Sequence, residues 1–159
     1  MRVGITGHRG LPGPVEDQVR PLLAEKIKRY GAQDLVGVSC IADGPDAWWA
    51  QLVLEAGGRI EVVVPATEYR DNLPEWHHQQ YDELIRRASD VHHTGIAEST
   101  SQAHQTGSEI LVGLSDEVVA VWDGLPARGY GGTADVVAYA QRVGVPVAVL
   151  WPEGATREP

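Results

Sequence analysis

Six short apolar runs recur along the chain, and longer, partly amphipathic segments separate them. The runs occupy residues 2–6, 35–39, 59–64, 91–93, 117–122 and 145–150. In most of them valine, isoleucine and leucine fill consecutive rather than alternate positions, which is typical of strands that helices cover on both faces. Short strands that alternate with helices predict an α/β protein with a largely parallel sheet.

The segments between the runs predict helices, and small residues mark their ends. We expect helices over residues 15–30, 45–56, 74–89, 101–114 and 133–143. Gly31, Gly57 and Gly144 follow three of these helices, at positions where a left-handed glycine ends a helix. Ser101 and Thr133 are expected N-caps, because their hydroxyls can accept a hydrogen bond from the first helical turn.

Composition indicates one compact domain that carries a negative charge. The chain has 159 residues, 43% hydrophobic and 22% charged, so we expect one domain over residues 1–152 and a frayed C-terminal tail at 153–159. Thirteen lysines and arginines against 22 acidic residues give 13 − 22 = −9 with neutral histidines. This charge repels nucleic acids and anionic membranes. We therefore expect no nucleic-acid partner, and an anionic ligand needs a local site.

Cysteine usage and hydropathy favour a reducing, aqueous compartment. Cys40 is the single cysteine, so no intramolecular disulfide forms. No apolar run approaches the ~20 residues that cross a bilayer, and no basic, apolar leader precedes the first strand. We expect a cytoplasmic protein with no membrane partner.

Glycine, proline, serine and aspartate gather at the predicted carboxyl ends of the strands, where open α/β sheets bind ligands. GHRGLPG follows the first run, SCIADGPD the second, a proline the third and WDGLPARGYGGT the fifth. The first loop has the spacing G-x-x-G-x-x-G, so an ordinary dehydrogenase or P-loop enzyme is disfavoured. His8 and Arg9 offer a titratable and a permanent cation to a phosphate, although a tight turn with a solvated arginine accounts for the same residues.

Two other stretches allow both a functional and a structural interpretation. Residues 131–133 can present backbone N–H groups and a hydroxyl to an anion at the start of the last helix. They can equally form a surface crossing with Asp135 in the first helical turn. Asp43 can accept a ribose hydroxyl or act as a general base, but for Asp43 and Asp46 in isolation a capping role at the next helix is favoured.

Histidine pairs do not predict a metal site. His77 and His78 are neighbours on a helix and point about 100° apart, and His92 and His93 face opposite sides of a strand. We therefore expect no metal ion. The tryptophans are expected to pack in the core or in subunit contacts, and we expect a homo-oligomer through the helix faces that carry them.

Taken in order, the motifs resemble those of the SLOG superfamily. This Rossmann-like group joins the Smf/DprA DNA-processing proteins, the Lonely Guy phosphoribohydrolases and the molybdenum-cofactor carrier proteins. The motifs are VGITGHRGL, GVSCIADGPDAWWA, VVVP, WHHQQYDELIRRASDV and SDEVVAVWDGLPARGYGGTADVVAYAQRVGVPVAVLWP. Within the superfamily the chain looks most like small, stand-alone bacterial proteins of the YpsA-like branch.

The resemblance implies a Rossmann-like three-layer sandwich, with a mostly parallel sheet of about six strands and helices on both faces. It also implies a nucleotide or nucleotide-derived ligand across the strand ends, bound in a sensor or carrier role with no required cofactor. The candidate contacts are Gly7, His8, Arg9, Ser39, Asp43, Gly44, Pro65, Gly131, Gly132 and Thr133.

One departure from the superfamily bears on catalysis. The phosphoribohydrolase motif P-G-G-x-G-T-x-x-E has a glutamate three residues after its threonine, where this chain has Val136. Glycosidic cleavage needs a carboxylate, so we favour binding over turnover. Asp43 and Asp135 are the candidate catalytic replacements. Two alternatives therefore stay open: a phosphoribohydrolase-like or deoxyribosyltransferase-like enzyme acting at an N-glycosidic bond, and a molybdenum-cofactor carrier.

Overall fold

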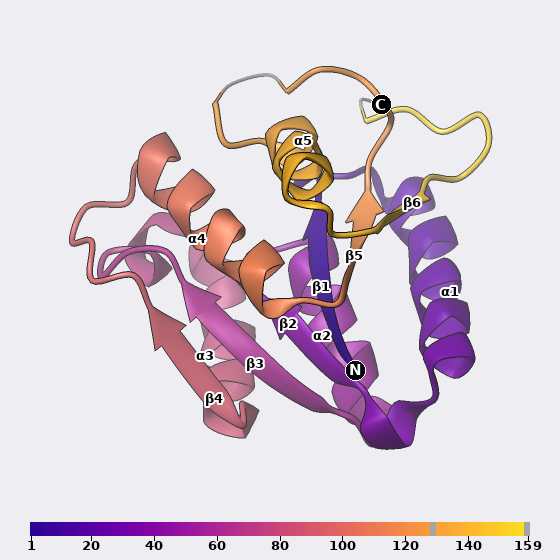
Figure 1. Cartoon of the computed structure of the whole chain (residues 1–159), viewed down its shortest axis with the longest axis horizontal. Helices are drawn as coiled ribbons and strands as arrows, with labels where there is room; N and C mark the ends of the chain where they lie inside the picture. Colours follow the sequence, from indigo (N-terminus) through magenta and orange to yellow (C-terminus); the bar gives the residue numbers. More distant parts are fainter. Residues whose placement is uncertain (128–129, 158–159) are drawn as a thin grey trace.

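The computed structural model describes residues 1–127 and 130–157, and in it every strand of the sheet is parallel to its neighbours (Figure 1). The strands are β1 (Arg2–Gly7), β2 (Val36–Ser39), β3 (Arg59–Val64), β4 (Asp90–His93), β5 (Glu117–Val121) and β6 (Val147–Leu150). Their spatial order is β4-β3-β2-β1-β5-β6. The predicted α/β fold class, a Rossmann-like three-layer sandwich with a mostly parallel sheet, is confirmed.

Helices cover both faces of this sheet. They are α1 (Gly13–Tyr30), α2 (Pro45–Glu55), α3 (His78–Arg87), α4 (Ser101–Leu114) and α5 (Thr133–Val143), with short 3-10 turns at Ala32–Asp34, Arg70–Asn72 and Glu75–His77. In Figure 1, α4 and α5 lie in front of the sheet, and α2 and α3 lie behind it. None of the helices in the described part of the chain has the length and apolar character to cross a membrane.

Local capping explains where the predicted helices differ from the observed ones. The helix expected over residues 74–89 begins later, because Pro74 is extended and a 3-10 turn at Glu75–His77 precedes α3. Thr100, and not Ser101, caps α4, since its side chain accepts a hydrogen bond from the N–H of Ala103 at 3.1 Å. Thr133 is the first residue of α5 and Gly132 is its N-cap, so both expected caps are wrong by one residue.

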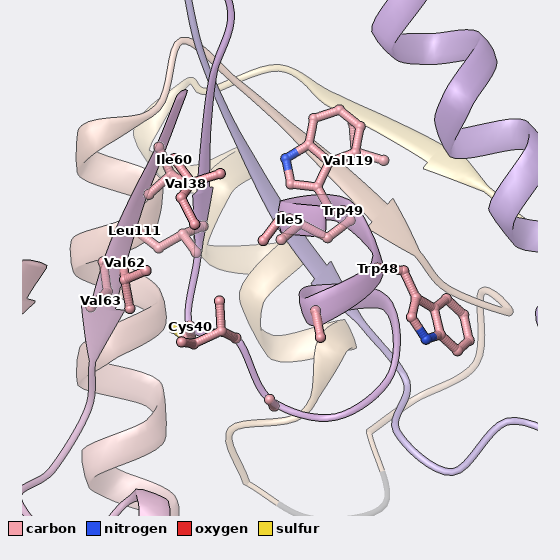
Figure 2. Packing of buried hydrophobic residues seen from close by; sticks show 14 of the residues in the cluster. Ile5, Val38, Cys40, Trp48, Trp49, Ile60, Val62, Val63, Leu111 and Val119 are labelled. Atoms are coloured by element: carbon pink, nitrogen blue, oxygen red, sulfur yellow. The ribbon is translucent and has the colours of Figure 1, made fainter. Parts of the chain in front are cut away.

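The core forms where α2 and α4 press on the sheet from opposite faces (Figure 2). Trp49 of α2 is fully buried, and its Nε1 donates to the carbonyl of Val3 at 3.2 Å. A Cβ atom on Gly37 would lie 3.0 Å from that nitrogen, whereas a Cβ on Gly4 would lie 2.7 Å from Leu111 of α4. Glycines in β1 and β2 therefore let both helices approach the sheet closely.

Two of the tryptophans are part of this core and not of a surface for subunit contacts. Trp48 and Trp49 are 7% and 0% exposed, whereas Trp76 is 75% exposed. A homo-oligomer stays a prediction, and of these three residues only Trp76 offers it an exposed ring.

The strand order changes direction beside β1, and this change positions the site. From β1 the chain adds β2, β3 and β4 on one side, then returns to place β5 and β6 on the other. The loops that follow β1 and β5 therefore start at the ends of two neighbouring strands. In open α/β sheets a crevice forms at such a switch point.

The contact between α4 and Pro65 yields a stability prediction with an internal control. A Cβ atom on Gly107 would lie 2.9 Å from the ring of Pro65, whereas a Cβ on Gly113 of the same helix meets nothing within 4 Å. We expect Gly107→Ala to lower the free energy of unfolding by about 1–3 kcal/mol through overpacking. Gly113→Ala should raise it by about 0.5–1 kcal/mol through helix propensity. Urea unfolding measures both, and equal stability of the two variants contradicts the packing argument.

Candidate functional site

A pocket of about 570 Å³ opens at the switch point, beyond the carboxyl ends of β1 and β5. This volume falls within the range of small-molecule sites. The loops after β1, β2 and β3, one face of α4, the start of α5 and the C-terminal segment all contribute to its walls. Seven of the ten candidate contacts line it: Gly7, His8, Arg9, Pro65, Gly131, Gly132 and Thr133.

The other three candidates, which belong to the end of β2 and the loop that follows it, do not line the pocket. The Ser39 hydroxyl donates to the carbonyl of Asp46 at 2.8 Å and accepts from the N–H of Ile41 at 2.9 Å, so it shapes the loop. Gly44 is the N-cap of α2 with a φ of 97°, a left-handed value that favours glycine. These residues are structural supports of the site, and none of the three lines it.

Asp43 holds the guanidinium of Arg9 at the pocket wall. Its Oδ1 lies 2.6 Å from Nη2 and 2.9 Å from Nε of Arg9. The Asp43 side chain is 9% exposed, whereas that of Arg9 is 46% exposed and lines the pocket. The Asp43 carboxylate therefore binds Arg9 without lining the pocket itself. This arrangement fits a positioning residue better than a general base.

One backbone N–H group at the glycine-rich start of α5 is already hydrogen-bonded to a side chain of that helix. The N–H of Gly131 donates to Oδ2 of Asp135 at 2.8 Å, so Asp135 is engaged at the helix start and does not line the pocket. The first N–H groups of a helix have no partner within it, and the helix dipole favours an anion there. Gly132 and Thr133 line the pocket, so the helix start can attract an anion at the pocket wall.

The C-terminal segment places a second arginine in the pocket. Arg157 is 11% exposed in its side chain, and its Nε lies 3.2 Å from Oδ2 of Asp123. Its Nη1 lies 3.1 Å from Nδ1 of His8. The other ring nitrogen of His8, Nε2, accepts from the backbone N–H of Asp123 at 3.2 Å and lies 3.2 Å from Oδ1 of the same residue. The predicted tail therefore contributes Arg157 to the pocket wall.

Asp123 remains ionised in this arrangement. Burial raises the pKa of its carboxyl group, but the hydrogen bond from the N–H of Leu125 and the nearby His8 and Arg157 lower it more. The net pKa lies below the usual value, so Asp123 is a permanent anchor for Arg157.

Asp46 is a residue of the pocket wall to which the sequence assigned only a capping role. It lies in the first turn of α2, is partly buried and lines the pocket. Burial raises the pKa of Asp46 to about 7; Arg9 offsets part of this shift, and Asp43 adds to it. At neutral pH the carboxyl group can therefore donate or accept a proton. Asp46 belongs to the SCIADGPD stretch, but nothing local in the sequence indicates that burial at the pocket wall shifts its pKa.

Aromatic rings form another wall that the loop motifs did not predict. Tyr69 and His104 line the pocket with their ring centroids 5.5 Å apart in an edge-to-face arrangement, and Tyr130 lines it as well. Burial lowers the pKa of His104, and Arg9 lowers it further, so the imidazole stays neutral.

Burial raises the pKa of the Cys40 thiol well above its ordinary value, which leaves it a poor nucleophile.

In the described residues, the group that has the geometry to hold a metal ion lies away from the pocket. Ligand atoms of Glu61, Asp90 and His92 lie within 4.8 Å of one another. Glu61 already accepts hydrogen bonds from Arg2 and His92, each at 2.9 Å. The network ties β4 to β1 across the sheet, and the absence of a metal stays a prediction.

This chain resembles known proteins in its structure, and no match was found from its sequence. No protein-family model and no curated protein matches the sequence. DNA processing protein A from Helicobacter pylori, whose single-stranded DNA binding mode has been described, gives a TM-score of 0.73 at 20% identity, over 98% of this chain and 68% of that chain. DprA from Streptococcus pneumoniae gives 0.68 at 19%, over 96% and 51%. The molybdenum cofactor binding protein of Rippkaea orientalis gives 0.61 at 20%, over 93% and 74%.

At these identities the likeness is one of fold. The chain shares a Rossmann-like α/β fold with these structures, and its membership of the SLOG superfamily stays a prediction. Membership of the YpsA-like branch and the expected exclusion of nucleic acid stay predictions.

The raised pKa of Asp46 makes the stability of the fold depend on pH. An aspartate of ordinary pKa 3.8 that titrates at about 7 when folded keeps its proton over a range in which the unfolded chain has lost it. Stability therefore falls as the pH rises from about 4 to about 7. We expect Asp46→Asn to be more stable than the wild type at pH 8, by about 1–4 kcal/mol, and to lose this advantage towards pH 4. Thermal unfolding across this range measures it, and a difference independent of pH contradicts it.

Proposed function

We propose that the chain binds a small phosphate-bearing ligand of the nucleotide type at the carboxyl ends of β1 and β5. The observation that carries this proposal is the convergence of Arg9 and the first turn of α5 on one pocket. Both favour anions, Arg9 by its fixed charge and the helix start by its N–H groups. A protein with a net charge of −9 repels anions elsewhere, so these groups supply a local attraction.

Aromatic residues of the same pocket suit the heterocyclic part of such a ligand. The rings of Tyr69, His104 and Tyr130 offer aromatic surface, on which a nucleobase can stack. The hydroxyls of Ser108 and Thr133 lie in the same pocket and can bind a ribose. The role inferred is reversible binding, as a sensor or carrier, with no cofactor required.

Turnover at an N-glycosidic bond is a second candidate function, supported by Asp46. Asp43 and Asp135 are engaged in positioning Arg9 and the start of α5, and neither lines the pocket. Asp46 does line it, with a pKa of about 7, which suits a general acid that protonates a leaving base. Val136, 2% exposed, supplies no carboxylate to the same wall.

A molybdenum-cofactor carrier is the remaining alternative, because the structural neighbours include a molybdenum cofactor binding protein and a carrier protein from Chlamydomonas reinhardtii. A pterin, like a nucleobase, is a flat heterocycle that the aromatic wall can accept. Protein purified from a host that makes the cofactor should then show pterin absorbance, and its absence excludes this alternative.

Arg9 provides the test of the binding proposal. We expect at least one of AMP, GMP, ADP, ADP-ribose and NAD to stabilise the wild type in thermal-shift and calorimetric titrations. Arg9→Ala should weaken that binding about tenfold or more, because a charge-assisted hydrogen bond to phosphate is lost. Arg59→Ala removes the same charge from an exposed position at the start of β3 and should bind as the wild type does. Binding of single-stranded DNA alone, or equal effects of both variants, overturns the proposal.

Chromatography decides the question of turnover. If the pocket cleaves N-glycosidic bonds, nucleotides incubated with the wild type release free base, and Asp46→Asn should reduce the rate at least about 100-fold, the contribution of a general acid. Asp43→Asn keeps Asp46 and serves as the comparison, with a smaller loss expected. Absence of free base over the whole panel rejects this second candidate.

A further inference from the structure

The C-terminal segment after β6 loops outward, returns beside the loop that follows β5 (Figure 1) and contributes Arg157 to the pocket. The indole N–H of Trp151 donates to the carbonyl of Ala155 at 3.0 Å, and the N–H of Ala155 donates to the carbonyl of Pro152 at 3.1 Å. The Trp151 ring also meets the ring of His8 edge to face, with centroids 5.7 Å apart. This compact turn is what carries Arg157 to the strand ends.

Arg157 and Arg9 are held in the same way from opposite sides of the end of β1. Asp43, which follows β2, binds Arg9, and Asp123, which follows β5, binds Arg157. Both arginines line the pocket, whereas neither aspartate does. The carboxylates therefore lie behind the guanidinium groups and fix their positions.

The strand order sets the separation of these anchors. Because β1 lies between β2 and β5, the two anchoring loops leave the sheet two strand spacings apart, about 10 Å. Arg157 uses Nε and Nη1 for Asp123 and His8, and a guanidinium has five N–H donors. Further donors of both arginines are thus available to a ligand that extends from one side of β1 to the other.

We propose that the pocket selects ligands with a diphosphate group, which spans Arg9 and Arg157 across the end of β1. The inference rests on the proposed function, and it assigns Arg157 as the residue that distinguishes a diphosphate from a monophosphate. A single phosphate binds to Arg9 and the start of α5, and the second phosphate binds to the arginine of the C-terminal segment. The class of ligand is a nucleoside diphosphate or a dinucleotide with a pyrophosphate bridge.

Isothermal titration of the full chain with AMP, ADP, inorganic phosphate and inorganic pyrophosphate tests this assignment. For the wild type we expect affinity for ADP at least about tenfold higher than for AMP, and affinity for pyrophosphate higher than for phosphate, as an added charged hydrogen-bond pair provides. Arg157→Ala should lower the affinity for ADP and pyrophosphate to the level of AMP and phosphate, and leave the affinity for AMP within about twofold of the wild type. Arg157→Lys keeps the charge without the planar fork, so it should recover part of the difference.

Two controls separate the possible failures. Arg142→Ala, in the last turn of α5, should leave all four affinities unchanged, and unfolding without ligand reports whether Arg157→Ala folds normally. Failure of every nucleotide to bind, with pyrophosphate still preferred over phosphate through Arg157, rejects the nucleotide proposal and supports the diphosphate assignment. Equal affinity of the wild type for ADP and AMP overturns the assignment. Tighter binding by Arg157→Ala also overturns it, because the segment then blocks the pocket.

Discussion

The missing side chain at Gly7 is the constraint on which the pocket depends. A Cβ atom there would lie 2.7 Å from Cβ of Pro45 and 3.1 Å from Cβ of Val121. Glycine therefore allows α2 and β5 to close together on the end of β1. The N–H of His8 continues the pairing of β1 with β5 by donating to the carbonyl of Val121 at 3.2 Å. The loops from both halves of the sheet then converge beyond one point, which is where an open α/β sheet forms its crevice.

The ion pairs around this crevice position two arginines more than they stabilise the fold. A largely buried ion pair gains little net free energy, because desolvation of both groups opposes their attraction. Asp43 and Asp123, 9% and 8% exposed in their side chains, nevertheless each bind one arginine of the pocket. Each pair also joins segments that are distant in sequence. The gain is geometric: two long, flexible side chains are fixed before a ligand arrives, which lowers the entropy cost of binding.

Local signals in the sequence predict the strands and most loop residues of the site, because both depend on neighbours along the chain. Consecutive apolar residues mark the strands, and glycines mark the strand ends that face the pocket. The other features of the site depend on contacts that no short stretch of sequence indicates. Ser39 turns inward because the carbonyl of Asp46 and the N–H of Ile41 bind its hydroxyl. Arg157 meets His8 from 149 residues away, and no local pattern indicates such a contact.

Asp46 links the anion affinity of the pocket to pH. Among the described residues that line the pocket, it contributes the carboxyl group, while Arg9 and Arg157 contribute permanent positive charge. With a pKa of about 7, Asp46 is neutral in mildly acidic solution and offsets part of that charge in mildly basic solution. A bound phosphate raises the pKa of a neighbouring carboxyl group by the same free energy with which protonation of that group strengthens phosphate binding. On the proposed function, proton uptake by Asp46 and anion binding therefore reinforce each other, and we expect loss of the Asp46 charge to strengthen the binding of an anion whose own charge is unchanged.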